Sequence, residues 1–131
     1  MTTVELTLSV LPDTFAVCRL DKDAPILEWG RRGFFSVTRT PDELSVVCRQ
    51  ADVPPGTRCE GGWRCLKVEG PLDFSWTGIL ASLAVPLAGA GISLFAISTY
   101  ETDYLLVKGD DLDSAARALA GSGHRVVVSP G

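Results

Sequence analysis

A run of 27 consecutive residues without a charge, from Phe74 to Tyr100, constrains the fold of this chain more than any other feature. An apolar helix of about 20 residues is long enough to span a bilayer. Pro86 and the glycine-containing tripeptide 89–91 interrupt the run, and the spacing of its apolar residues changes there from helical to strand-like. We therefore expect a helix that ends at the glycines, a strand that follows it, and no membrane span.

The elements around this run follow an order that indicates one fold. In chain order we expect a strand at 63–68, a helix at 78–88, strands at 92–99 and 104–108, a helix from 111 to 120 and a strand at 125–128. Ser75 or Thr77 is the expected cap of the first helix. This order predicts an antiparallel four-stranded sheet with both helices on one face, the α+β ferredoxin-like fold.

An internal repeat extends this prediction to the first half of the chain. Segment 35–47 matches segment 95–107, sixty residues later, in its apolar alternation, its turn and its acidic residue. We therefore expect two copies of one unit, at 1–62 and 63–131. The alternative is that any two hairpins look alike.

The first copy is degenerate in its helices. It has a turn predicted at 11–14, a short candidate helix at 26–29, a hairpin at 34–49 and a Pro/Gly-rich loop at 52–62 where the second helix belongs. A sheet without helices leaves one face uncovered, so we expect that face to pack against the other copy or a second chain.

Charge and motif content exclude several functional classes. Twelve basic residues against sixteen acidic ones give a net charge of −4, so the chain has no electrostatic footprint for nucleic acid or an anionic membrane. The G-x-S-x-G, Walker A and G-x-G-x-x-G motifs are absent. The single histidine, His124, is expected at the surface near a helix end. We expect neither an enzyme nor a bound cofactor.

The cysteines and the amino terminus indicate the compartment. Cys18, Cys48, Cys59 and Cys65 form no C-x-x-C pair and have no cluster of histidines beside them, which argues against a metal site. The amino terminus lacks the basic start and apolar core of a signal peptide. We therefore expect a cytoplasmic protein with reduced thiols.

Two segments, 34–47 and 78–107, resemble small bacterial proteins with tandem ACT domains, and are similar to the ACT units of aspartate kinases and of the CASTOR arginine sensors. The most specific part is the Ser-Thr-Tyr-x-Thr-Asp-Tyr stretch at 98–104. The resemblance implies two tandem ACT-like units that form a regulatory module. It also implies an amino-acid ligand bound at an interface between units, a homodimer, and a partner protein regulated in trans.

The resemblance places a ligand at the loop that enters the helix of the second unit. Backbone N–H groups and the positive end of the helix dipole suit a carboxylate there. Asp103 matches the acid of the family motif and is preferred to Glu101 for the ligand's ammonium group, although a turn aspartate would look the same. The candidate ligand-binding residues are Asp73, Ser75, Trp76, Thr77, Gly78, Ile79, Thr99, Tyr100 and Asp103.

Trp76 stands where the arginine sensors carry an acid. This departure argues against arginine and leaves room for an apolar amino acid or one that contacts an aromatic ring. Two alternatives to a ligand-binding module remain open: a protein–protein interaction or dimerisation module without ligand, and an enzyme or thiol-redox protein.

Overall fold

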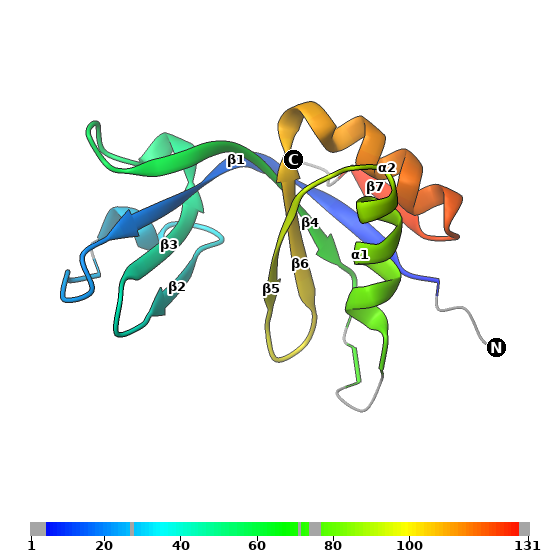
Figure 1. The fold of residues 1–131 in the computed structure, drawn as a ribbon, viewed down its shortest axis with the longest axis horizontal. Helices are drawn as coiled ribbons and strands as arrows, with labels where there is room; N and C mark the ends of the chain where they lie inside the picture. The colour runs from blue at the N-terminus through cyan, green and yellow to red at the C-terminus, as the bar shows by residue number, and fades with distance from the viewer. Residues whose placement is uncertain (1–4, 27, 71, 74–76, 129–131) are drawn as a thin grey trace. The chain divides into compact units, whose positions relative to one another are not determined.

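The computed structural model describes residues 5–26, 28–70, 72–73 and 77–128 (Figure 1). The chain divides into two compact units: unit 1 contains Met1–Pro12 and Arg64–Gly131, and unit 2 contains Asp13–Trp63. Two strands, β1 (Thr7–Leu20) and β4 (Cys59–Val68), contribute residues to both units. The division after Trp63 adjoins the boundary expected at residue 62, whereas the first twelve residues group with the second half of the chain.

Unit 1 is an α+β unit with the predicted order of elements. After its part of β4 come α1 (Ile79–Gly89), β5 (Leu94–Ser98), β6 (Asp103–Lys108), the 3-10 helix η3 (Gly109–Asp111), α2 (Leu112–Gly121) and β7 (Arg125–Val128). The strands lie side by side in the order β7-β1-β4-β6-β5. Among the described residues, no helix is both long and apolar enough to cross a membrane.

The sheet of unit 1 differs from the prediction in one strand. The first part of β1 enters between β4 and β7, and it pairs with β7 in parallel from Thr7↔Arg125 to Val10↔Val128. The expected four-stranded antiparallel sheet is therefore wrong in this detail. The sequence pattern assigned residues 6–10 to the first copy because it compared them with the strand that opens the second.

Both helices cover the same face of this sheet, as predicted. Ile79, Leu83 and Leu87 of α1 and Ala115 and Leu119 of α2 are buried in one core cluster. The sheet contributes residues of alternating position to that cluster: Leu6, Leu8, Val10, Leu66, Val68, Leu105 and Val107. Leu80, which is adjacent to Ile79 on α1, is 39% exposed.

His124 lies inside unit 1 and not at its surface, which corrects the expectation for this residue. Its side chain is only 5% exposed. The Leu6 backbone N–H donates to Nδ1 at 3.2 Å, so the proton sits on Nε2, which donates to the Ser82 carbonyl oxygen at 3.0 Å. One imidazole thus satisfies backbone groups of the segment before β1 and of α1, a role that a single sequence does not reveal.

Replacing His124 with alanine is expected to destabilise the protein by about 2 kcal/mol, because the Leu6 N–H and the Ser82 carbonyl both lose their side-chain partner in a buried place. Urea unfolding followed by circular dichroism measures the change. Arg117→Ala, at an exposed position on α2, is the control and should stay within about 0.5 kcal/mol of the parent. Equal stabilities for the two variants would contradict this role of His124.

Unit 2 contains, among its described residues, strands and 3-10 helices but no α-helix. Besides its parts of β1 and β4 it has η1 (Glu28–Arg31), β2 (Ser36–Arg39), β3 (Leu44–Arg49) and η2 (Gln50–Asp52). The strand order is β2-β3-β1-β4. The sequence predicts a copy at 1–62 that is degenerate in its helices, and the described residues of unit 2 form two 3-10 helices.

The sheet of unit 2 is nevertheless covered by its own connecting segments. Ala24 and Trp29 pack against a core of Ala16, Cys18, Leu44, Val46 and Cys48 on one face. On β1, Phe15 contacts Phe34 edge to face with ring centroids 5.6 Å apart. On this face the loop that carries Trp29 packs where a helix would otherwise lie.

The turn predicted at 11–14 is also wrong, since β1 continues through Pro12. The fixed φ of proline and the preference of the preceding residue for extended backbone suit a strand as well as a turn. The residues of the turn motif therefore do not distinguish a turn from a strand at this position.

The predicted internal repeat has a structural counterpart, but at a spacing of 59 residues. Arg39 and Leu44 close the β2–β3 hairpin, and Ser98 and Asp103, each 59 residues later, close the β5–β6 hairpin. The sequence match at sixty was ambiguous because Val46, Val47 and Cys48, like Leu105, Leu106 and Val107, are all buried. An unbroken apolar run fits at either spacing.

Candidate functional site

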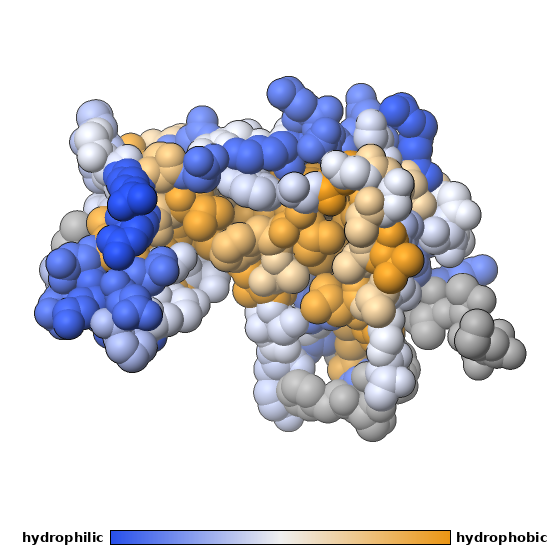
Figure 2. Space-filling view, viewed as in Figure 1, coloured by the Kyte–Doolittle hydropathy of each residue, from blue (hydrophilic) through white to orange (hydrophobic). Residues whose placement is uncertain are grey.

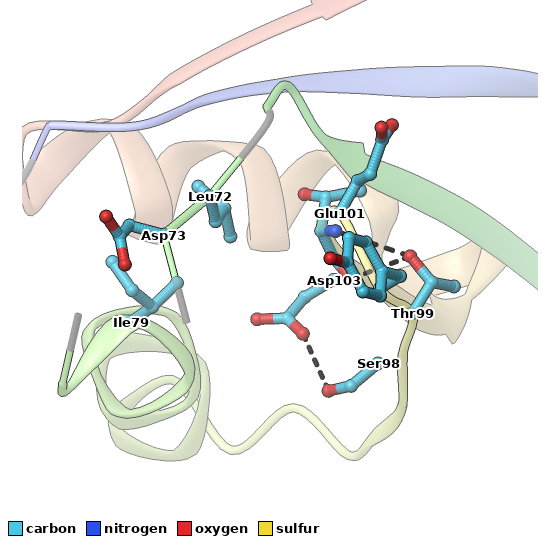
Figure 3. Close-up of a pocket in the computed structure, with 9 residues that line it drawn as sticks. Leu72, Asp73, Ile79, Ser98, Thr99, Glu101 and Asp103 are labelled. Atoms are coloured by element: carbon cyan, nitrogen blue, oxygen red, sulfur yellow. Dashed lines mark hydrogen bonds between the residues drawn. The ribbon is translucent and has the colours of Figure 1, made fainter. Parts of the chain in front are cut away.

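A pocket of about 190 Å³ opens in unit 1 beside the first residue of α1 and the tip of the β5–β6 hairpin (Figure 3). It is lined by Leu72, Asp73, Ile79, Ser98, Thr99, Tyr100, Glu101, Thr102 and Asp103. Three segments that are distant in sequence therefore supply its wall: the loop after β4, the start of α1 and the hairpin tip.

The hairpin tip is fixed by a threonine at its first position. The Thr99 N–H donates to the Thr102 carbonyl oxygen at 2.8 Å, and the Thr99 hydroxyl lies 3.0 Å from the same oxygen. The Thr102 N–H donates to that hydroxyl at 3.3 Å. Thr40 and Glu43 make the same three contacts at the tip of the β2–β3 hairpin.

The loop after β4 is held against this tip. The Thr102 hydroxyl, in a residue only 6% exposed, donates to the Val68 carbonyl oxygen at 2.5 Å. The Leu72 N–H donates to the Glu101 carbonyl oxygen at 2.7 Å. A Cβ at Gly70 would lie 3.1 Å from both the Glu101 oxygen and the Leu72 nitrogen. Glycine at this position therefore lets the two backbones approach, and the approach carries Leu72 and Asp73 to the pocket.

Gly70→Ala is expected to destabilise the protein by about 1 kcal/mol, because the added methyl presses on backbone atoms that cannot move aside independently. Gly89→Ala is the matched control. Nothing lies within 4 Å of the methyl it adds, and alanine favours the helix by about 0.5–1 kcal/mol. Thermal unfolding should thus show opposite shifts for the two variants. A Gly70→Ala protein as stable as the parent would contradict the close approach.

The pocket carries negative charge. Among the described residues, its lining includes the carboxylates of Asp73, Glu101 and Asp103 and no lysine or arginine. The Ser98 hydroxyl donates to Oδ1 of Asp103 at 2.6 Å, which orients that carboxylate. Figure 3 shows the Asp103 carboxylate directed toward α1 and Asp73, while the Glu101 carboxylate points away from Asp103. A cationic group is therefore the electrostatic complement of the pocket, and Asp103 is placed to receive it.

The start of α1 supplies positive electrostatic potential to the pocket. Its cap residue is Gly78, with φ 77°, and among the residues that the structure describes no side chain caps the first turn. The predicted capping by Thr77 is therefore wrong, and Ser75 lies outside the described residues. The first N–H groups of α1 and its dipole are available to an anion, and Ile79, the first helical residue, lines the pocket.

Comparisons with known proteins identify the family. A model described as an ACT domain matches residues 58–121, and a second model, described as an N-terminal domain, matches residues 13–56. The crystal structure of protein Atu0741 from Agrobacterium tumefaciens is 38% identical, with a TM-score of 0.92, over 98% of this chain and 96% of that one. Residues 58–121, just under half of this chain, therefore match an ACT domain. The resemblance stated from the sequence is thereby confirmed, and so is an ACT-like α+β fold.

Two further relatives place the ACT domain in context. The bovine protein named cytosolic arginine sensor for mTORC1 subunit 1 is 32% identical over an alignment of length 98 that covers 66% of this chain and 30% of that protein. This chain thus spans less than a third of the length of that relative. The allosteric aspartate kinase of Clostridium acetobutylicum shares the fold, with a TM-score of 0.63 and 11% identity over 83% of this chain and 33% of that one.

The structure brings together five of the nine candidate site residues in the ACT-domain pocket: Asp73, Ile79, Thr99, Tyr100 and Asp103. Thr77 and Gly78 directly precede Ile79 and are exposed, whereas Ser75 and Trp76 lie outside the described residues. The lining also includes Leu72, Ser98, Glu101 and Thr102. Thr102 could have been found from the repeated turn, but the docking of Leu72 depends on tertiary contacts with no sequence signal.

The described residues include no group of His, Cys, Asp and Glu side chains arranged to hold a metal ion.

Proposed function

We propose that this chain is a regulatory module that binds a free amino acid in the pocket of unit 1. The observation that carries the proposal is the pairing of an oriented carboxylate, Asp103, with the uncapped start of α1 across one small pocket. A free amino acid has an ammonium and a carboxylate bonded to the same carbon atom. The ammonium fits Asp103, and the carboxylate fits the N–H groups of the helix.

Size and charge narrow the ligand class. The volume of about 190 Å³ is below the roughly 300–1,000 Å³ of pockets for drug-sized molecules, which favours a single small metabolite. Three carboxylates in the lining disfavour an acidic side chain on the ligand. Neutral and basic amino acids are therefore the candidates. The name of the bovine relative, an arginine sensor, supports the same class.

The module acts on another protein. No catalytic site is part of the proposal, so occupancy has its effect by shifting an equilibrium in a partner that binds one ligand state better than the other. The aspartate kinase relative is described as an allosteric enzyme, and the bovine relative as a cytosolic sensor. We propose a cytosolic sensor that works in trans.

A thermal-shift screen of the twenty amino acids tests the ligand. A true ligand at a hundred times its dissociation constant stabilises the protein by about 2.7 kcal/mol. Asp103→Asn removes a charge-assisted hydrogen bond worth about 1.5–3 kcal/mol, so binding should weaken about 10- to 100-fold. Asp113→Asn, an exposed acid on α2, is the control and should bind like the parent.

Two results would refute this proposal. One is the absence of a shift with any amino acid for the parent protein. The other is an equal loss of affinity in the Asp103 and Asp113 variants, since a remote exposed carboxylate has no contact with the pocket.

The two units are, in our proposal, copies of one ACT-like ancestor. The repeated threonine turn supports this, as does the 3-10 helix that follows the second hairpin strand in each unit, η2 in one and η3 in the other. The spacing of these features is 59 residues in both cases.

A second candidate function, self-association, is favoured by the outer face of α1. This helix has no charged residue, and its exposed side chains include Leu80 at 39% and Val85 at 68%. Figure 2 shows apolar side chains gathered over α1. A helix that is apolar on all sides is ordinarily buried, so we propose that this face packs against a second copy of the chain.

Val85→Glu is expected to convert such a dimer to a monomer, because it places a charge in the apolar contact. Light scattering coupled to size-exclusion chromatography measures the mass. The matched control is Val128→Glu, on β7, where the side chain is 81% exposed and lies off this helix. A monomeric parent protein, or a dimer that survives Val85→Glu, would exclude this face as the interface.

A further inference from the structure

Three of the four cysteines come together in unit 2, although the sequence spreads them over 42 positions from Cys18 to Cys59. Cys18 lies on β1, Cys48 on β3 and Cys59 on β4, and β1 is the strand between the other two. Cys18 pairs with Val46, and Ala16 pairs with Cys48, so Cys18 and Cys48 share one face of the sheet. These three cysteines are not among the residues of the proposed ligand site.

The register of β1 and β4 sets Cys18 opposite Cys59. The Arg19 N–H donates to the Arg58 carbonyl oxygen at 2.9 Å, which makes Arg19 and Arg58 a hydrogen-bonded pair. The neighbouring pair, Cys18 and Cys59, is then of the non-hydrogen-bonded type. In such pairs the Cα atoms are about 4.5 Å apart, within the roughly 4.4–6.8 Å that a disulfide requires.

The thiols also contact one another. Cys18 shares a side-chain hydrogen bond with Cys48 and another with Cys59, and these bonds, together with burial, raise its pKa well above the ordinary value. The Cys48 bond is the largest cause, and the same bond lowers the pKa of Cys48.

Exposure differs among the three sulfurs. Cys18 and Cys48 are buried, at 1% and 0%, whereas Cys59 is exposed. A dissolved oxidant therefore reaches Cys59 first, whereas Cys18 is buried in the core of unit 2 on the neighbouring strand.

We propose that Cys59 and Cys18 form a reversible intramolecular disulfide when a small hydroperoxide, such as hydrogen peroxide, reaches the exposed Cys59. The Cys59 thiolate attacks one peroxide oxygen, the O–O bond breaks, and the products are a Cys59 sulfenic acid and hydroxide, which takes up a proton to become water. The Cys18 sulfur then attacks the Cys59 sulfur. The S–O bond breaks, and the departing hydroxide takes the Cys18 proton to form a second water. Two thiols and one peroxide give one disulfide and two waters.

Cys65 supplies an internal contrast. It belongs to unit 1, it is buried, and burial raises its pKa to about 12. A protonated and inaccessible thiol does not react with a dissolved oxidant. Cys65 therefore stays reduced while the Cys59–Cys18 bond forms.

The trypsin sites separate the four cysteines, so mass spectrometry of the digest can identify which two form the disulfide. Cleavage after lysine and arginine places the four cysteines in four separate peptides, 1–19, 40–49, 59–64 and 65–67. The full-length folded protein is treated with hydrogen peroxide, its remaining thiols are blocked in denaturant, and the digest is analysed by mass spectrometry without reduction. The expected result is a cross-link between peptides 1–19 and 59–64, with 40–49 and 65–67 blocked as free thiols. Dithiothreitol should restore all four thiols.

Two variants test the assignment. Cys59→Ser removes an exposed thiol without disturbing the core and should abolish the cross-link, while the matched control Cys65→Ser should leave its yield unchanged; circular dichroism confirms that each is folded. A bond from Cys48 to either partner would overturn the proposal, as would a bond between two chains on a non-reducing gel. Stable oxidation of Cys59 to sulfinic acid with no cross-link would do so as well.

Discussion

The hydrogen bond from the buried Thr102 hydroxyl to the Val68 carbonyl oxygen is the contact on which the site of this ACT domain depends. It joins the end of β4 to the tip of the β5–β6 hairpin, directly before β6 begins its pairing with β4. The close passage of Gly70 and the bond from Leu72 to Glu101 follow from the same docking. A hydroxyl without a partner there would cost more than the bond contributes, so the arrangement is strongly favoured once formed.

The two kinds of charge in the pocket come from different parts of the chain, the negative charge from side chains and the positive character from backbone groups. Negative charge comes from carboxylates on the loop and the hairpin, and positive character comes only from the first turn of α1. A side-chain cap at α1 would consume the N–H groups that an anion needs. Glycine at the cap position leaves them available at the cost of a weaker helix start. The local helix is thus less stable than it would be with serine or aspartate in this position, a common trade at binding sites.

The sequence predicted local elements well where one physical pattern dominates. Strands β3 and β7 have the bounds expected from the sequence, 44–49 and 125–128. Helix α1 begins and ends within one residue of the expected 78–88. Three further features depended on partners that the local pattern does not show. Pro12 fits a strand as readily as a turn, His124 is buried by Leu6 and Ser82, and β1 enters a sheet with β7 at the far end of the chain. Asp103 could be proposed because it is part of a motif, whereas Leu72 reaches the pocket only through tertiary contacts.

The threonine turn has a consequence for how such a protein can change over evolutionary time. The hydrogen bonds that close the tip come from its first and fourth residues, Thr99 and Thr102, and the contact of Glu101 with Leu72 uses a backbone oxygen that every amino acid possesses. The side chains of Tyr100 and Glu101 are therefore not needed to close the hairpin. The equivalent turn in unit 2 has Pro41 and Asp42 at these positions and the same closure. Mutation at the two central positions can alter what the pocket recognises while the scaffold persists, so new ligand preferences are accessible by single substitutions.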